Sequence, residues 1–225
     1  MIGMLRSLGS GVFASVILLL APAGAGAGQV RTLTNLHGNV LYQRPGAALQ
    51  PLARSASVAV TRSDIAATRR ASMGALTLPD SSRILLGENT RVRIGGFSES
   101  SVTSAHFVIY NGKTRFFVEH PAGAKANYTF ETPVAQIAVR GTVGDISVDI
   151  NDGMRLNVYH VGDPGLPVIV RTIYGQRFTL HGGQKVWVRW LNGRLVGRET
   201  ALSRAEIARF AQFGAPPRID GGLPP

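Results

Sequence analysis

FETPVAQIAVRGTVGDISVDI, residues 130–150, contains the alternation of apolar and polar side chains that decides the fold class. A period of two at 145–150 predicts a strand with one buried face and one face in water. The buried face takes Ile146, Val148 and Ile150, and the wet face takes Asp145, Ser147 and Asp149. Pro133 cannot donate to a strand ladder, so it marks the start or the edge of a strand.

The same pattern extends over residues 38–200, where short β-branched and aromatic runs are separated by turn residues. Asn111–Gly112, 151–153 and Asn192–Gly193 tolerate positive φ, and each predicts a hairpin. The strand, long helix, strand rhythm of a parallel α/β sheet is absent from the sequence. We therefore predict an all-β domain over 38–200. Two architectures remain open, an antiparallel sandwich and a solenoid-like β-roll, both of many short strands.

A short C-terminal α-helix is predicted at 201–214. Ser203 and Glu206 have the spacing of a capping box, and Leu202 with Ile207 has that of a hydrophobic staple. The apolar stripe Ile207, Phe210 and Ala211 is expected to pack on the β domain. Gly214 ends the helix, and residues 215–225 are predicted to be a disordered tail.

The composition excludes several classes of protein. With 225 residues, 44% of them apolar, and no Cys, the chain can bury a core but has no disulfide, catalytic cysteine or thiolate metal site. Twenty-four basic residues against 13 acidic ones give a formal net charge of +11, which favours an anionic partner. Because 21 of the basic residues are Arg, a bias that GC-rich codon usage also produces, the charge alone identifies no partner.

Residues 1–27 have the pattern of a secretory signal peptide. One Arg precedes an apolar stretch at 12–21, and a run of small residues follows, with cleavage expected after Ala25 or Ala27. The stretch is shorter than the ~20 residues of a membrane span, so we expect a periplasmic or secreted protein. An uncleaved N-terminal membrane anchor is the alternative. Residues 28–37 are expected to be a lead-in, and no nucleic-acid partner is expected in an exported protein.

Four segments occur in an order that is typical of one family: 63–68 (SDIAAT), 77–92 (TLPDSSRILLGENTRV), 130–142 (FETPVAQIAVRGT), and Gly183–Gln184 before Val186. With them, the chain from about Gly38 to Trp190 resembles the FecR-like domain family, named for the ferric citrate regulator of bacterial envelopes. The best-known members are membrane-spanning regulators whose cytoplasmic segment acts on a sigma factor. Only a handful of residues precede the apolar stretch here, so we expect an exported binding or sensing module without anti-sigma activity.

We interpret the residues that carry this resemblance as structural. They are Thr132, Pro133, Val139, Arg140, Gly141, Thr142, Asp80, Ser81 and Ser82. A glycine after an apolar strand, as at 141, indicates a bulge or a close backbone approach. Residues 80–82 are expected to form a β-turn whose side chains bond their own backbone.

The candidate partner-binding residues are Trp187, Arg189, Trp190 and Arg194. Trp187 and Trp190 are three positions apart, so on a regular strand they point to opposite faces. An exposed indole beside an arginine stacks on a sugar or anchors a protein partner. Burial of both indoles in the core is the alternative that their size favours.

The sequence contains no motif for catalysis, metal binding or cofactor binding, and its five histidines are scattered. We therefore expect neither an enzyme nor a cofactor. Our leading hypothesis is a periplasmic FecR-like module that binds an envelope protein, either a receptor or a membrane regulator, and takes part in signalling. The second hypothesis is binding of an anionic envelope glycan or of lipid headgroups by an Arg-rich face. The third is an enzyme that acts on an envelope polymer through residues on distant strands.

Overall fold

The computed structural model describes residues 31–98, 100, 102–119, 125–152, 154–211 and 213. The signal peptide predicted at 1–27, the helix stop predicted at Gly214 and the tail predicted at 215–225 lie outside these residues. The described part of the chain contains seventeen strands and one helix, α1 (Arg204–Ala211). Within the same residues, no helix has the length and apolar character that crossing a membrane requires.

The strands form two sheets that share β9. Sheet A has the order β4 (Ser57–Val60), β1 (Arg31–His37), β6 (Met73–Thr77), β7 (Arg83–Leu86), the second half of β9 (Val102–Phe117), β12 (Val143–Asp149), β13 (Arg155–His160), β16 (Gln184–Leu191) and β17 (Arg194–Ala201). Sheet B has the order β3 (Gln50–Leu52), β2 (Val40–Gln43), β5 (Ile65–Thr68), β8 (Arg91–Ser98), the first half of β9, β10 (Lys125–Glu131), β11 (Ala135–Val139), β14 (Val168–Thr172) and β15 (Arg177–Leu180). The pairing of β9 with β10 is parallel, and the other pairings are antiparallel.

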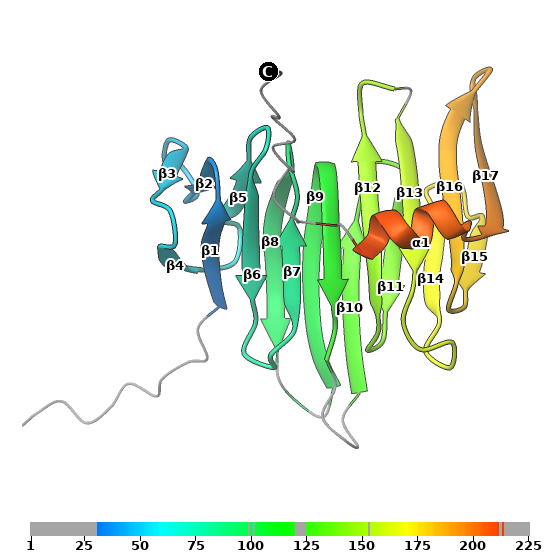
Figure 1. Cartoon of the computed structure of the whole chain (residues 1–225), viewed down its shortest axis with the longest axis horizontal. Helices are drawn as coiled ribbons and strands as arrows, with labels where there is room; N and C mark the ends of the chain where they lie inside the picture. The colour runs from blue at the N-terminus through cyan, green and yellow to red at the C-terminus, as the bar shows by residue number, and fades with distance from the viewer. Residues whose placement is uncertain are drawn as a thin grey trace, which may run out of the picture.

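The chain passes back and forth between the sheets while it advances along the long axis of the molecule, from β1 at one end to β17 at the other (Figure 1). The all-β prediction is therefore confirmed. The layers are those of a sandwich, whereas the path of the chain is that of a roll, which explains why the sequence pattern did not separate the two architectures.

The core lies between the two sheets. Phe116 of sheet A meets Phe130 of sheet B with ring centroids 5.5 Å apart, and Phe130 stacks on Phe107 at 5.4 Å. Phe116 and Phe130 are fully buried, and burial of such a side chain contributes about 1.5–3 kcal/mol. Side chains from nearly every strand join the same cluster, so the sheets share one hydrophobic core.

The hairpin predicted at Asn111–Gly112 does not form: the chain turns there, but β9 changes sheets, so its two halves pair with different strands. The first half of β9 is antiparallel to β8 and the second half is antiparallel to β7, so the chain reverses direction at this point. Gly112 has φ +96°, and a Cβ there would lie 2.4 Å from the Cα of Thr90. A side chain at position 112 would therefore strain both the backbone and its packing.

The turns that the structure describes in full, and the hairpin turn at 149–152, lie at one of two rims, called upper and lower as they appear in Figure 1. The upper rim comprises the turns at 36–39, 53–56, 69–72, 87–90, 110–112, 132–134, 149–152, 173–176 and 191–194. The lower rim comprises those at 44–49, 61–64, 78–82, 140–142, 161–167 and 181–183.

Two details of the strands differ from the sequence analysis. Residues 31–37, expected to be a lead-in, form β1, and Leu33 of this strand is fully buried. Ile150, expected in the core, is 47% exposed because β12 ends at Asp149 and the chain turns at the upper rim. Ile146 and Val148 are buried as predicted.

The helix begins as predicted, but one residue of its predicted apolar stripe is exposed. Ser203 donates its backbone N–H to Glu206 Oε2 at 2.9 Å, and the Glu206 N–H is donated to Ser203 Oγ at 3.3 Å, so the capping box is present. Ile207, however, is 48% exposed. Phe210 of the predicted stripe does contact the outer face of sheet A, together with Glu206.

Candidate functional site

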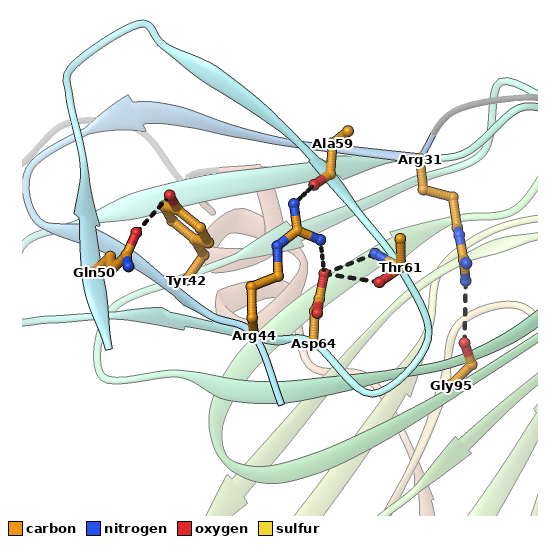
Figure 2. Close-up of polar contacts among 8 residues, drawn as sticks. All are labelled: Arg31, Tyr42, Arg44, Gln50, Ala59, Thr61, Asp64 and Gly95. Atoms are coloured by element: carbon orange, nitrogen blue, oxygen red, sulfur yellow. Dashed lines mark hydrogen bonds and ion pairs between the residues drawn. The ribbon is translucent and has the colours of Figure 1, made fainter. Parts of the chain in front are cut away.

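At the lower rim, the turn between β4 and β5 is held by a buried carboxylate. Asp64 is fully buried, and its Oδ2 accepts hydrogen bonds from Arg44 Nη1 at 2.6 Å and from the Thr61 N–H at 2.8 Å (Figure 2). Arg44 also donates to the carbonyl of Ala59 on the edge strand β4 at 2.8 Å. One arginine therefore ties the end of β2 both to this turn and to the edge of sheet A.

The remaining contacts in Figure 2 close the same end of the molecule. Arg31 Nη1 donates to the carbonyl of Gly95 at 3.1 Å and so joins the start of β1 to β8. Tyr42 donates its hydroxyl to Gln50 Oε1 at 2.8 Å, across the pair formed by β2 and β3. Strand β3 has three residues, one of them Pro51, so neither sheet has a long edge at this end.

The predicted turn at 80–82 forms and reaches the opposite sheet. Asp80 Oδ1 accepts the backbone N–H of Ser82 at 3.1 Å, as expected for a turn that bonds its own backbone. Asp80 Oδ2 accepts the Ser82 hydroxyl at 3.0 Å and the hydroxyl of Tyr128 at 2.6 Å. Tyr128 is fully buried on β10, so this turn of sheet A holds sheet B in register. Ser81, at the exposed tip, has φ +70°.

The segment 139–142 forms another polar contact at the lower rim. Val139 is fully buried, Arg140 is exposed, and Gly141 has the left-handed φ of +96° that lets the chain turn from β11 to β12. Thr142 Oγ1 lies 2.8 Å from His160 Nε2. His160 Nδ1 lies 3.0 Å from the carbonyl of Leu180, so Nδ1 carries the proton and Nε2 accepts the threonine hydroxyl. Burial lowers the pKa of His160, which keeps the ring neutral.

The other half of that motif lies at the opposite rim. Thr132 Oγ1 accepts the N–H of Ala135 at 3.0 Å and donates to its carbonyl at 2.8 Å, which closes the turn between β10 and β11 at the upper rim. Pro133 is exposed at the tip of this turn. The residues of the motif therefore do not form one site. Thr132 and Thr142 hold their turns by side-chain hydrogen bonds, and Gly141 supplies a positive φ.

The four candidate partner-binding residues are also divided between two surfaces. Trp187 and Arg189 lie on the outer face of sheet A, where the guanidinium is 4.8 Å from the indole centroid. Trp190 is half-buried on the inner face and packs against the core. Arg194 is exposed at the upper rim. Both indoles are partly buried, so neither the fully exposed nor the fully buried alternative describes them.

Among the described strands, β17, which begins at Arg194 and pairs with the strand that carries the other three residues, is the longest with an open edge. It has eight residues and pairs with β16, and no described residue pairs with its other edge. The remaining edge strands are β3, β4 and β15, with three, four and four residues. The sequence analysis noted the Asn192–Gly193 turn before β17 but not the strand's open edge, because edge exposure depends on the order of the strands.

A second feature, beneath α1, was not expected from the sequence. Arg115 is 6% exposed and makes two hydrogen bonds to Asp145, at 2.7 and 2.9 Å. Its guanidinium lies 3.4 Å from the ring centroid of Phe210 and 4.4 Å from that of Phe213, and it donates to the Phe210 carbonyl at 2.5 Å. Asp145, predicted to lie in water, is therefore covered by the end of the helix.

A cavity of about 480 Å³ opens beside this contact, between α1 and sheet A. Its lining includes both signs of charge, with Glu88, Lys113, Asp145, Glu206 and Arg209 among them. Burial raises the pKa of Asp145, and the hydrogen bonds and charge of Arg115 oppose this rise. Across the described residues, no group of three or more His, Asp or Glu side chains is placed to hold a metal ion.

Glu206 holds the start of the helix to the sheet. It pairs with Lys185 of β16 and accepts hydrogen bonds from the N–H and the hydroxyl of Ser203. Burial acts to raise the pKa of Glu206, but the hydrogen bonds from Lys185 and Ser203 and the charge of Lys185 outweigh it and lower the pKa to about 2. The carboxylate is thus ionised at neutral pH.

Comparisons with known proteins agree with the geometry. A family model described as FecR protein matches residues 64–160, which include the turns at Asp64, 78–82 and 140–142. Two crystal structures of a "putative anti-sigma factor" from Parabacteroides distasonis ATCC 8503 share the fold, with TM-scores of 0.51 and 0.52 at 17% sequence identity. The match covers 66% of this chain and 64% of the other, so it spans less than two thirds of those proteins. No curated protein matches this chain significantly.

Proposed function

We propose, because this chain carries a FecR-like domain, that the protein is a non-enzymatic interaction and sensing module of the bacterial envelope. It is exported to the periplasm, binds an envelope protein and takes part in signalling. The family match and the fold shared with the Parabacteroides protein support a regulatory role. The pattern of residues 1–27 supports export.

The open edge of β17 is the observation that carries the proposed mechanism. An exposed strand edge offers a row of unpaired N–H and C=O groups to an extended segment of another protein. At the other end of the molecule, Arg44 bonds a carbonyl of β4, and β3 contains a proline. One edge of the sandwich is therefore long and available, while the others are short or partly covered.

The hairpin between β16 and β17 determines which backbone groups of β17 are available. Asn192 and Gly193 have φ +49° and +73°, so the loop is a two-residue turn of positive φ, closed by the hydrogen-bonded pair Leu191 and Arg194. Hydrogen-bonded and non-hydrogen-bonded pairs alternate along an antiparallel ladder. The N–H and C=O groups of Gly197 and Glu199 consequently point away from β16, toward an incoming strand.

The side chains beside this edge favour an acidic partner segment. Arg198 is exposed directly opposite Trp187, with Arg189 next on the same face of sheet A. A strand added to β17 would place alternate side chains beside these groups, because successive residues of a strand point to opposite faces. Carboxylates on that face would pair with the arginines, and an apolar residue would cover the half-buried indole.

A pair of substitutions at one position tests this mechanism. Glu199→Pro removes an outward N–H and leaves the β16–β17 ladder intact, whereas Glu199→Ala removes the same side chain and keeps the N–H. We expect tagged protein, crosslinked in cells and recovered from the envelope fraction, to retain one envelope protein with Glu199→Ala. With Glu199→Pro the yield should fall about tenfold. Equal recovery with both variants would contradict docking at the β17 edge.

Processing of the chain is tested in the same experiment. Mass spectrometry of the recovered protein is expected to give a new N-terminus at Gly26 or Gly28, after cleavage at Ala25 or Ala27. A chain that keeps its first residues and fractionates with the membrane would establish the anchored alternative.

A further inference from the structure

Exposed apolar side chains gather at one rim of the molecule. Seven large apolar side chains of the described residues are exposed: Leu36, Tyr110, Ile150, Ile173, Tyr174, Leu191 and Ile207. Six of them lie at turns of the upper rim, or one residue from such a turn, and the seventh lies on α1. Single exposed apolar residues are ordinary, but their concentration at one rim indicates a surface that meets a partner.

The two most exposed members are held by neighbouring turns. Ile173 and Tyr174, at the tip between β14 and β15, are 57% and 66% exposed. The Ile173 N–H donates to the carbonyl of Val134 in the β10–β11 turn at 3.0 Å. The Tyr174 and Trp190 rings are perpendicular with centroids 5.7 Å apart, next to the β16–β17 turn. Three turns thus support one projecting apolar tip.

Three arginines that make no ion pair with a described residue lie around this tip. Arg171 and Arg177 are directly opposite each other across β14 and β15, and Arg194 is at the β16–β17 tip. All three are exposed, and none makes an ion pair with a described residue. Like charges directly opposite on a sheet repel each other, so a bound anion would relieve this repulsion.

The combination fits an anionic lipid surface. The apolar side chains are on separate convex turns with arginines between them, an arrangement suited to a plane rather than to a groove. Aromatic and aliphatic side chains of this kind enter the interfacial layer of a bilayer, and arginines beside them bind lipid phosphates.

We infer that the C-terminal half of the upper rim, formed by the turns at 132–134, 173–176 and 191–194, docks onto an anionic membrane surface. Ile173, Tyr174 and Leu191 enter the headgroup layer, and Arg171, Arg177 and Arg194 contact lipid phosphates. Strand β17 runs from this rim toward the lower rim, so its open edge stays free for a protein while the tip contacts lipid. The inference therefore goes beyond the proposed function and does not depend on it.

Vesicle sedimentation tests the inference with protein purified after expression of the full chain. Vesicles with one third phosphatidylglycerol are compared with vesicles of phosphatidylcholine alone, over a series of salt concentrations. We expect at least about tenfold stronger binding to the anionic vesicles, decreasing as salt rises. No binding, or equal binding to neutral vesicles, would overturn the inference. Because the assay contains no other protein, its failure is distinct from failure of docking at β17.

Matched variants show whether the rim carries the binding. Ile173→Ser with Tyr174→Ser should weaken binding about tenfold, whereas Ile207→Ser, at a similarly exposed apolar position on α1, should leave it unchanged. Arg171→Gln with Arg177→Gln should reduce both binding and its salt dependence, whereas Arg62→Gln with Arg140→Gln at the lower rim should have a smaller effect. Equal effects of a variant and its control would refute docking at this rim. The inference would also be refuted by two results together: the unaltered chain binds no vesicles, and the variant with Ile173→Ser and Tyr174→Ser no longer crosslinks to an envelope protein. The tip would then contact protein and not lipid.

Discussion

The two rims of the sandwich differ in the side chains that their turns present to solvent. At the lower rim, Asp64, Asp80 and Thr142 are tied by hydrogen bonds to partners on other strands, and their side chains are wholly or mostly buried. At the upper rim, the turns project Ile173, Tyr174 and other apolar side chains into solvent. Buried or half-buried polar side chains also hold turns of the upper rim, at Thr68, Thr90 and Thr132. What distinguishes the rims is that, among the described turns, the large exposed apolar side chains lie at the upper one, which is why we assign partner contacts to it.

The residues that match the family model are distributed unevenly over the proposed partner-binding surfaces. The turns at Asp64, 78–82 and 140–142 lie within the matched residues 64–160 and at the lower rim. The apolar tip and β17 lie outside the matched region, beyond residue 160. The region that matches the FecR family model therefore supports the apolar tip and β17, whose own residues lie outside the match.

The largest difference between the rims is expected from two aspartates in turns. Asp80→Ala leaves the buried hydroxyl of Tyr128 without this partner and should lower the free energy of unfolding by about 3 kcal/mol. Asp149→Ala at the upper rim removes bonds to the exposed N–H groups of Asn151 and Asp152 and should cost about 1 kcal/mol or less. Urea denaturation measures both, and equal costs would contradict the distinction between the rims.

A pH series tests the buried contact between Thr142 and His160. Burial lowers the pKa of His160. Just below about pH 6.5, its imidazole is therefore protonated in the unfolded chain but still neutral in the folded chain. The stability from keeping this ring neutral is fully present above pH 6.5 and is lost progressively as the pH falls from that value through the lower pKa of the folded state. Denaturation midpoints from pH 8 to pH 5 should decline with a slope that His160→Gln removes. A slope of the same size in His160→Gln would contradict this assignment.

A smaller effect is expected at α1, which starts beside the lower rim. With the pKa of Glu206 lowered to about 2 from 4.5, its contribution is present above pH 4.5 and is lost as the pH falls toward 2. Glu206→Gln should destabilise the protein by about 1 kcal/mol at pH 7, because it weakens the capping box and removes the ion pair with Lys185. Hydrogen exchange of α1 should show loss of protection in acid that the variant lacks.

The smallest effect on stability is expected where the effect on binding is largest. Ile173→Ser at the upper rim should change the free energy of unfolding by no more than about 0.5 kcal/mol, since the side chain is mostly exposed. Thermal denaturation of this variant, beside the vesicle assay, separates a surface role from a structural one. A cost of several kcal/mol would assign Ile173 to the fold.

The sequence predicted most of the strands because their alternation is local. The hairpin at Asn192–Gly193 and the capping box at Ser203 and Glu206 also depend on residues close together in the chain, and they were correct. The hairpin predicted at Asn111–Gly112 was wrong, because the strand segments on its two sides pair with different sheets. Strand β1 was missed because Asn35 occupies a buried position of its pattern, where its amide donates to the carbonyl of Leu52 at 2.8 Å.

The candidate site was less predictable because it depends on contacts across the chain. The alternation of its strand predicts that Asp145 faces solvent. Its burial is explained by the helix residue Phe210 and the guanidinium of Arg115, both distant in sequence. The open edge of β17 likewise follows from the order of nine strands in a sheet. Tyr174 was not singled out because one aromatic residue in a turn carries no periodic signal.

Photo-crosslinking from three exposed positions in living cells tests the account most directly. A photoreactive residue is placed in turn at Glu199 on the β17 edge, at Tyr174 on the upper rim and at Arg140 on the lower rim. The account predicts an adduct with one envelope protein from position 199, an adduct with lipid from position 174, and neither from position 140. A protein adduct from position 140, with none from positions 199 and 174, would contradict it, because the lower rim would then be the surface that meets partners.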